Sequence, residues 1–281
     1  MKPPIKQAPE SGRHEFARNA AEFGKQIDFG KTASDYGRFR AGYPGELYRR
    51  LERLGIGGAG HRVLDLATGT GFLGRGFARC GCRVTGVDIA LGMMREAARL
   101  DREGGLAVTY ARATAEALPF AQGSFDVVTA GQSWHWFDRS AAAAEARRVL
   151  RPGGWLVIAH FDWIALPGNV VEATERLIEK HNPKWKLGGG LGIHPLWPRD
   201  AAMAGFIEIE TFSFDVMVPY THEAWRGRIR ASAGIAAVLT PGQVAAFDAE
   251  LSDLLRERYP DDPMGVFHRT FAMVGRVPAT V

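Results

Sequence analysis

The feature that most constrains the fold is an alternation of strand and helix patterns over residues 46–159. Amphipathic helices are predicted between most of the strands, because apolar residues recur there every three or four positions. Short, apolar strands are predicted at residues 62–66, 83–88, 106–111, 124–130 and 155–159. The alternation indicates an α/β fold with a parallel sheet and helices on both of its faces. Ligands of such sheets bind beyond the carboxyl ends of the strands.

The pattern changes after His160. A helix is predicted over residues 169–180, and Thr240 with Gln243 has the form of a capping box that opens another helix. Strands are predicted at residues 207–218, with a bulge near Thr211 where the apolar phase shifts, and at residues 269–276. This half of the chain is therefore expected to complete the sheet and to cover the site.

Composition excludes several classes of protein. Apolar residues make up 46% of the chain and charged residues 23%, which is typical of globular proteins. No apolar stretch approaches the roughly 20 residues that span a bilayer, and the N-terminus has no apolar signal core, so no membrane partner is expected. Cys80 and Cys82 cannot form a disulfide framework or, alone, a four-ligand zinc site, so we expect a cytoplasmic location and no metal.

The charge pattern does not indicate a nucleic-acid partner. The net charge is +4, from 35 Lys and Arg against 31 Asp and Glu. The longest basic runs are pairs, Arg49-Arg50 and Arg147-Arg148, and acidic residues are interspersed. Nucleic-acid binders usually gather basic residues on one face, so we interpret these charges as solvated surface. No pattern indicates the oligomeric state.

The most informative motif is VLDLATGTG at residues 63–71, which leads from a strand through a glycine-rich turn into a helix. Gly69 and Gly71 would let a ligand approach the backbone, and the helix that follows presents free N–H groups. Asp88 ends the next strand, 23 residues after Asp65. Its carboxylate could accept hydrogen bonds from both hydroxyls of a ribose. The motif therefore predicts a cofactor that contains a nucleoside.

Two cofactors fit this turn. Residues 69–74 also satisfy G-x-G-x-x-G, so an NAD-dependent oxidoreductase is an alternative. Asp65 argues against it, because a pyrophosphate at the turn would face a fixed carboxylate, and like charges about 4 Å apart repel by several kcal/mol at an effective dielectric of about 20. S-adenosylmethionine has no phosphate and carries an ammonium and a sulfonium, which a carboxylate attracts. The turn therefore favours S-adenosylmethionine, with S-adenosylhomocysteine as the product.

With these motifs the sequence resembles the class I S-adenosylmethionine-dependent methyltransferases of the small-molecule branch. That branch includes the ubiquinone/menaquinone C-methyltransferases and the trans-aconitate methyltransferases. Five motifs carry the resemblance, in order along the chain: VLDLATGTG at 63–71, VD at 87–88, ATAEALPF at 113–120, SFDVV at 124–128 and LRPGG at 150–154.

The resemblance implies a Rossmann-like, seven-stranded sheet whose last strand is antiparallel. It also implies three segments in the chain. Residues 1–45 would form an N-terminal tail and cofactor lid, and residues 46–160 the core that binds S-adenosylmethionine. Residues 161–281 would form the substrate-cap segment and the strands that complete the sheet.

The resemblance further implies how the cofactor is held. Asp65 and Gly69 would hold its methionine end, Asp88 its ribose, and Ile89 would pack on the adenine. In the lid, Arg40 would pair with the methionine carboxylate, and Tyr36 and Tyr43 match the same segment. The remaining predicted cofactor contacts are Ala67, Thr70, Gly71, Met93, Thr114, Ala115, Glu116 and Gln132.

Two of these positions depart from the family pattern. Ala67 replaces the usual first glycine, which is a mild change if its φ is negative. Thr114 stands where the family often has an Asp that accepts a hydrogen bond from the adenine amine. A threonine hydroxyl can also accept one, but it carries no charge.

The acceptor side is expected at GQSWHWFD, residues 131–138, which follows the fourth strand. Trp134 and Trp136 are predicted to line the acceptor pocket together with Tyr43 and Trp163. His135 could take a proton from the acceptor. The alternative is that residues 134–136 are a packed apolar edge and that His135 only positions its neighbours.

The sequence therefore predicts methyl transfer from S-adenosylmethionine to a small molecule by in-line displacement. The accepting atom, whether oxygen, nitrogen, carbon or carboxylate, is left open. The alternatives are an NAD-dependent oxidoreductase, a nucleic-acid methyltransferase and a non-catalytic adenosine-binding module. The fourth strand leads into Gln132-Ser-Trp and not into the Asn/Asp-Pro-Pro-Tyr type of sequence often used for exocyclic amines, which argues against the nucleic-acid alternative.

Overall fold

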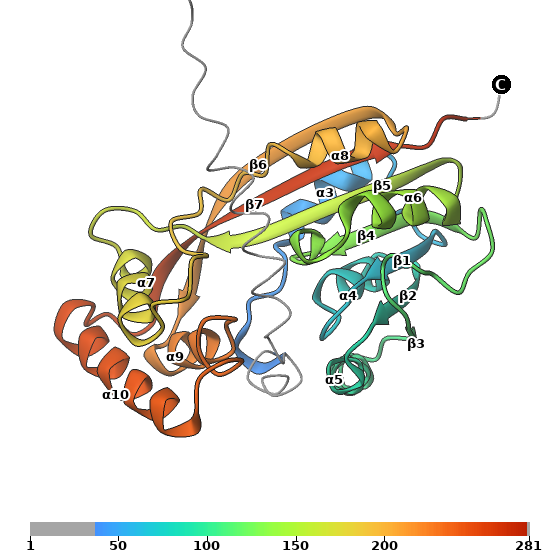
Figure 1. Cartoon of the computed structure of the whole chain (residues 1–281). Coiled ribbons are helices and arrows are strands. Elements are labelled where there is room, and N and C mark those ends of the chain that lie inside the picture. Colours follow the sequence, from blue (N-terminus) through green and yellow to red (C-terminus); the bar gives the residue numbers. More distant parts are fainter. Residues whose placement is uncertain (1–36, 280–281) are drawn as a thin grey trace, which may run out of the picture.

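A seven-stranded sheet forms the centre of the computed structural model, which describes residues 37–279 (Figure 1). The strands are, in chain order, β1 (Arg62–Leu66), β2 (Arg83–Asp88), β3 (Val108–Arg112), β4 (Phe125–Gly131), β5 (Leu150–Trp163), β6 (Ile207–Tyr220) and β7 (Met264–Arg276). Their spatial order is β3-β2-β1-β4-β5-β7-β6. Strands β1 to β5 are parallel, and β7 runs antiparallel to both β5 and β6. This confirms the predicted Rossmann-like sheet with an antiparallel last strand.

Helices cover both faces of the parallel part of the sheet. Apolar side chains of α6 and α8 join one core cluster with the sheet, and those of α3 and α4 join another. These helices and their neighbour α5, which packs beside β2 and β3, have the bounds α3 (Gly45–Arg53), α4 (Phe72–Arg79), α5 (Leu91–Glu103), α6 (Arg139–Val149) and α8 (Trp197–Met203).

A close approach sets the position of α3 against α4. The Tyr48 hydroxyl donates a hydrogen bond to the carbonyl of Leu73, 3.1 Å away, in the first turn of α4. The Tyr48 ring lies over Gly76, where an added Cβ would come within 1.9 Å of the ring. A larger residue at position 76 would therefore push α3 away from α4.

Three helices form a separate cap at one end of the long strands (Figure 1). They are α7 (Val170–His181), α9 (His222–Arg230) and α10 (Pro241–Arg258). Their apolar faces bury Trp225 and Phe247 in a cluster of their own, which also includes residues of β6 and β7. The predicted capping box at Thr240 and Gln243 is confirmed at the start of α10.

The long strands correct two details of the prediction. β5 runs through Leu150–Trp163, well beyond the predicted residues 155–159, because its last residues pair with β7 as far as Trp163 and His268. The irregularity in β6 lies between Ile207 and Glu210, a little before the predicted bulge, and Glu208 has a positive φ of 49° there.

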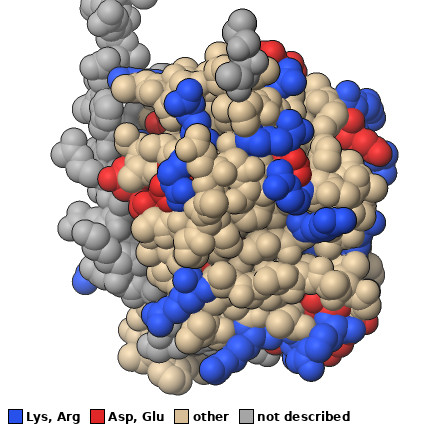
Figure 2. All heavy atoms as spheres, turned by 90° about the vertical axis from the view of Figure 1, so that its right-hand side faces the viewer, with Lys and Arg blue, Asp and Glu red and all other residues tan. Residues whose placement is uncertain are grey.

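The surface charges and the helix lengths bear on the predicted partners. On the face shown in Figure 2, Lys and Arg side chains are dispersed, and several lie beside Asp or Glu. Between residues 37 and 279, every helix is too short or too polar to cross a bilayer.

Candidate active site

The turn between β1 and α4 has the backbone geometry of a close-approach loop. Gly69 and Gly71 have positive φ values of 55° and 81°, a conformation that favours glycine. Ala67 also has a positive φ, 44°, so the condition under which its replacement of glycine would be mild is not met. A left-handed L-residue costs about 1–2 kcal/mol, so Ala67 holds local strain beside the turn. Thr70 is buried between the two glycines.

Asp65 organises the turn from below. Its side chain is only 1% exposed, and its oxygens accept hydrogen bonds from the hydroxyls of Thr68 (2.7 Å) and Thr129 (2.6 Å) and from the N–H of Gly74 (3.2 Å). Burial raises the pKa of Asp65 to about 6, although these hydrogen bonds oppose the shift. The carboxylate therefore lies under the turn and holds it. A contact with the methionine end of a cofactor stays a prediction.

Asp88 lies beside the turn at the end of β2. Its two oxygens accept hydrogen bonds from the N–H groups of Gly69 and Ala90, each at 2.8 Å. Burial raises the pKa of this carboxyl, and the hydrogen bonds partly offset that effect. The next residue, Ile89, is 62% exposed, which is unusual for a large apolar side chain. An exposed isoleucine beside a carboxylate suits an adenosine, because the apolar base can pack on one and the ribose can bond to the other.

The other predicted cofactor residues differ in their burial and in their contacts. Met93 is buried, and its terminal methyl lies 3.4 Å from the place where a Cβ on Gly69 would stand. Ala115 is buried and Thr114 is exposed, while Glu116 accepts a hydrogen bond from the N–H of Asp138. The predicted contact Tyr36 lies outside the described residues.

A cavity of about 510 Å³ opens at the carboxyl ends of β4 and β5. Its walls come from the loop after β4, the end of β5, the loop before α8, and α9. Five residues predicted for the site line it, namely Arg40, Gln132, His135, Trp136 and Trp163. Because β1 and β4 are neighbours in the sheet, the cavity and the glycine turn lie at the same edge.

Two residues predicted for the acceptor pocket are not among those that line this cavity. Trp134 is 0% exposed, and its indole N–H donates to Asp200 at 3.2 Å in the core beneath α6 and α8. The Tyr43 hydroxyl donates to the carbonyl of Ala159 at 3.0 Å, which fixes the segment before α3 to β5. Of the two tryptophans around His135, Trp134 lies in the core and Trp136 lies on the cavity wall. The two residues belong to one short helical turn, residues 134–136, and their side chains point to different sides of it.

Histidines gather on the cavity wall. The rings of His135 and His160 lie 5.3 Å apart, and those of His160 and His194 lie 4.3 Å apart. Burial, with a smaller effect of the neighbouring His160, lowers the pKa of His135 well below its usual value. Burial also lowers the pKa of His160 to about 4. Both imidazoles are therefore neutral at pH 7, and a neutral imidazole can accept a proton.

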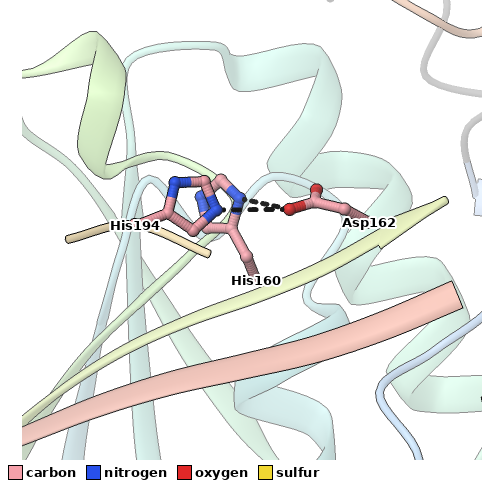
Figure 3. Close-up of side chains that lie close together, drawn as sticks. All are labelled: His160, Asp162 and His194. Carbon is pink, nitrogen blue, oxygen red and sulfur yellow. Dashed lines mark hydrogen bonds and ion pairs between the residues drawn. The ribbon is translucent and has the colours of Figure 1, made fainter. Parts of the chain in front are cut away.

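Sequence reasoning missed His160, Asp162 and His194, which lie together on this wall (Figure 3). His160 and Asp162 are two residues apart on β5, so they point to the same face of the strand. That spacing was visible in the sequence as His160-Phe-Asp162 at the end of the fifth strand. His194 comes from the loop between α7 and α8, and no local pattern connects it with β5.

Comparisons with known proteins agree with this geometry. Residues 64–158 match the methyltransferase domain family. The chain is 37% identical over 130 residues to an uncharacterized methyltransferase of Mycobacterium tuberculosis. That alignment covers 46% of this chain and 50% of the relative. It is also 42% identical over 116 residues to a demethylmenaquinone methyltransferase of Thermus thermophilus. That alignment covers 40% of this chain and 53% of the relative. The chain thus spans about half the length of these curated relatives.

Solved structures extend the likeness to the whole fold. A structure assigned as a type II methyltransferase from Anaeromyxobacter dehalogenans superposes with a TM-score of 0.64 at 25% identity, over 86% of this chain and all of that one. The [4+2]-cyclase SpnF superposes with a TM-score of 0.53 at 21% identity over 99% of this chain and all of that one. The chain thus has the Rossmann-like fold of these methyltransferase structures, and residues 64–158 are similar to the methyltransferase domain family.

Proposed function

We propose that this protein transfers a methyl group from S-adenosylmethionine to a small molecule bound in the cavity at the ends of β4 and β5. One observation carries the proposal: the glycine turn with Asp65 and Asp88 and the histidine-lined cavity lie at the same edge of one sheet. A fold alone does not define an activity, as the cyclase with the same fold illustrates. The proposed activity is therefore inferred from the residues of the site.

The turn fits the cofactor. Gly69 leaves the backbone open, Asp88 can accept bonds from ribose hydroxyls, and Ile89 offers an apolar surface to adenine. When bound there, S-adenosylmethionine would supply a methyl group activated by a sulfonium. The Asp65 carboxylate below the turn would favour the positive charge and oppose the pyrophosphate of NAD.

The cavity residues would orient the acceptor and handle its proton. Trp136 and Trp163 give the cavity large aromatic walls, which hold a small molecule in one orientation and exclude water. His135 lines the cavity and is neutral, so its free ring nitrogen could take the proton that the acceptor loses as its bond to the methyl group forms. The burial that lowers the pKa of His135 also makes it a weaker base than an exposed imidazole. We assign His135 as the candidate base on these grounds. The acceptor is small because the cavity holds about 510 Å³.

Two further parts of the proposal concern setting and partners. Neither Cys80 nor Cys82 is in a disulfide, which fits the reducing cytoplasm that we propose as the location. On the face shown in Figure 2, the basic residues are dispersed, so this face gives no support to a nucleic-acid acceptor.

Binding to two cofactors tests the first half of the proposal. Purified protein is titrated in a calorimeter with S-adenosylhomocysteine and, separately, with NADH. We expect saturable binding of S-adenosylhomocysteine and none of NADH, because only the former lacks a pyrophosphate. Tight NADH binding without S-adenosylhomocysteine binding would favour the oxidoreductase.

Transfer itself is tested with a radiolabelled methyl donor and a library of small acceptors. Salt-dependent retardation of RNA or DNA in a gel, with labelling of the nucleic acid, would favour the nucleic-acid methyltransferase instead. Binding of S-adenosylhomocysteine with no transfer to any class of acceptor would favour a non-catalytic adenosine-binding module.

A further inference from the structure

His160, Asp162 and His194 converge on one point of the cavity wall (Figure 3). The Nδ1 atom of His160 and the Nε2 atom of His194 each lie 3.3 Å from the same carboxylate oxygen, Oδ2 of Asp162. All three candidate ligand atoms lie within 4.8 Å of one another. Two imidazole nitrogens thus face a single oxygen across equal distances.

These distances suit a shared metal ion better than two hydrogen bonds. A charge-assisted N–H···O bond is about 2.7–2.9 Å long, so 3.3 Å is long for either pair. Zinc binds nitrogen and oxygen at about 2.0–2.2 Å, and atoms at the corners of such a tetrahedron lie about 3.3–3.6 Å apart. Both observed N···O distances match the edge of a tetrahedral site. The two nitrogens lie within 4.8 Å of each other, and the ion would draw them to about the same edge length.

We propose that His160, Asp162 and His194 bind a divalent transition-metal ion of the zinc type, with a remaining coordination position open to the cavity. Two imidazoles and one carboxylate are a ligand set for Zn²⁺ or Fe²⁺, whereas Mg²⁺ and Ca²⁺ prefer oxygen ligands. An open fourth position on the cavity side is the arrangement of catalytic zinc sites. The ion would there meet an oxygen or nitrogen of a molecule bound in the cavity. This proposal departs from the sequence-based prediction of no metal, and it does not depend on the proposed methyl transfer.

The surroundings hold the three ligands in place. The Nε2 amide of Gln132 donates to the other oxygen of Asp162 at 3.1 Å, which leaves Oδ2 directed at the histidines. The ring of His194 stacks on Trp197, with centroids 3.8 Å apart and planes 4° from parallel. His160 is also in contact with Trp197, at 4.7 Å between centroids. Outer groups that fix ligand orientation are a regular feature of metal sites.

Metal binding is measured on protein without a histidine tag, after treatment with a chelator. The full chain is titrated with Co²⁺, and the visible d–d absorption of bound Co²⁺ is followed. Zn²⁺ binding is measured separately by calorimetry. We expect one ion per chain, and we expect one equivalent of Zn²⁺ to remove the Co²⁺ absorption.

Three variants assign the ion to this cluster. Asp162→Asn keeps the shape of the side chain and its bond with Gln132, and His194→Gln changes a loop residue that is partly exposed. Each is expected to weaken Zn²⁺ binding by more than about 100-fold, because a ligand is lost. The matched control is His61→Gln, at the opposite end of β1, which we expect to bind Zn²⁺ as the unchanged protein does.

Two outcomes would overturn the proposal. One is the absence of Co²⁺ absorption and of Zn²⁺ heat in the unchanged protein. The other is unchanged affinity in both Asp162→Asn and His194→Gln, which would place the ion elsewhere. Binding of S-adenosylhomocysteine is measured on the same samples and is expected to change less than about twofold, because the cluster lies outside the turn. If the unchanged protein does not bind S-adenosylhomocysteine, the proposed methyl transfer is wrong, whereas the proposed metal site is not affected.

Discussion

The glycine turn at the ends of β1 and β2 and the cavity at the ends of β4 and β5 are built in opposite ways. The turn itself comes from one short segment between β1 and α4. Asp65 and Asp88 are hydrogen-bonded to its backbone N–H groups and to the hydroxyls of Thr68 and Thr129. The cavity is assembled from segments far apart in the chain, and it includes polar atoms with no hydrogen-bond partner among residues 37–279. Nε2 of His160 and Oγ of Ser232 are two of them.

This contrast suggests that the glycine turn and the cavity have different roles. The hydrogen bonds of Asp65 and Asp88 hold the turn in one shape whether or not a ligand is present, which suits a cofactor that many enzymes share. Among residues 37–279, the buried hydroxyl of Thr70 in the turn also has no hydrogen-bond partner. A buried polar atom without a partner is costly, and a bound molecule or ion can supply the missing partner. We therefore propose that the cavity determines which acceptor is bound.

The two tryptophans around His135 should differ most in stability. Trp134→Ala is expected to lower the free energy of unfolding by about 3–5 kcal/mol, because it empties a fully buried site in the core. Trp136→Ala should cost less than about 1 kcal/mol, because that side chain is partly exposed on the cavity wall. Urea unfolding of both variants measures the difference. Equal losses would mean that the 134–136 segment is a single packed edge.

His135 should affect turnover and not cofactor binding. His135→Ala is expected to lower kcat about 100-fold on an acceptor found in the library, because the proposed base is lost. Its affinity for S-adenosylhomocysteine, measured by calorimetry, should stay within about twofold of the original. If kcat is unchanged, His135 is a positioning residue, as the alternative interpretation of the sequence had it.

Asp88 should affect cofactor binding directly. Asp88→Ala is expected to weaken binding of S-adenosylhomocysteine by more than about tenfold, because the ribose loses its acceptor and the N–H groups of Gly69 and Ala90 lose theirs. Calorimetry measures the change, with Asp215→Asn as a control on the exposed side of β6, where the carboxylate pairs with Arg269. If Asp88→Ala binds S-adenosylhomocysteine with unchanged affinity, Asp88 does not bind the ribose.

Asp65 should make cofactor binding depend on pH. Because burial raises the pKa of Asp65 to about 6, the free protein holds a proton there below pH 6 that an ammonium-bearing ligand must displace. The affinity for S-adenosylhomocysteine is therefore expected to fall by up to about tenfold per pH unit below pH 6 and to level off above it. Calorimetry between pH 5 and about pH 8 tests this. A flat profile, the same as that of Asp65→Asn, would show that Asp65 only holds the turn.

Ala67 should give the smallest effect. Because its φ is 44°, Ala67→Gly relieves left-handed strain of about 1–2 kcal/mol and adds about 0.4–1 kcal/mol of chain entropy to the unfolded state. We expect a net gain of about 0.5–1 kcal/mol in the free energy of unfolding. Thermal and urea unfolding measure it. A loss of stability would mean that the Ala67 methyl group makes contacts worth more than the strain.

Much of the turn could be predicted from the sequence. The strand before it, Gly69 and Gly71, the helix after it and Asp88 at the end of β2 lie where the local patterns indicated. Local patterns predicted the position of a side chain less well where its neighbours come from distant parts of the chain. Trp134 was expected in the pocket and is in the core, because α8 supplies Asp200 as a partner for its indole. The positive φ of Ala67 could not be predicted, since alanine does not normally favour it.

The order of strands and helices, the class of fold and the glycine turn follow from local sequence patterns, because hydrophobic periodicity and glycine positions act over a few residues. The residues that form the cavity are brought together by long-range packing. His194 meets Asp162 from 32 positions away because the loop before α8 folds back over the end of β5. Contacts of that kind depend on how the cap packs against the sheet, and no local pattern specifies them.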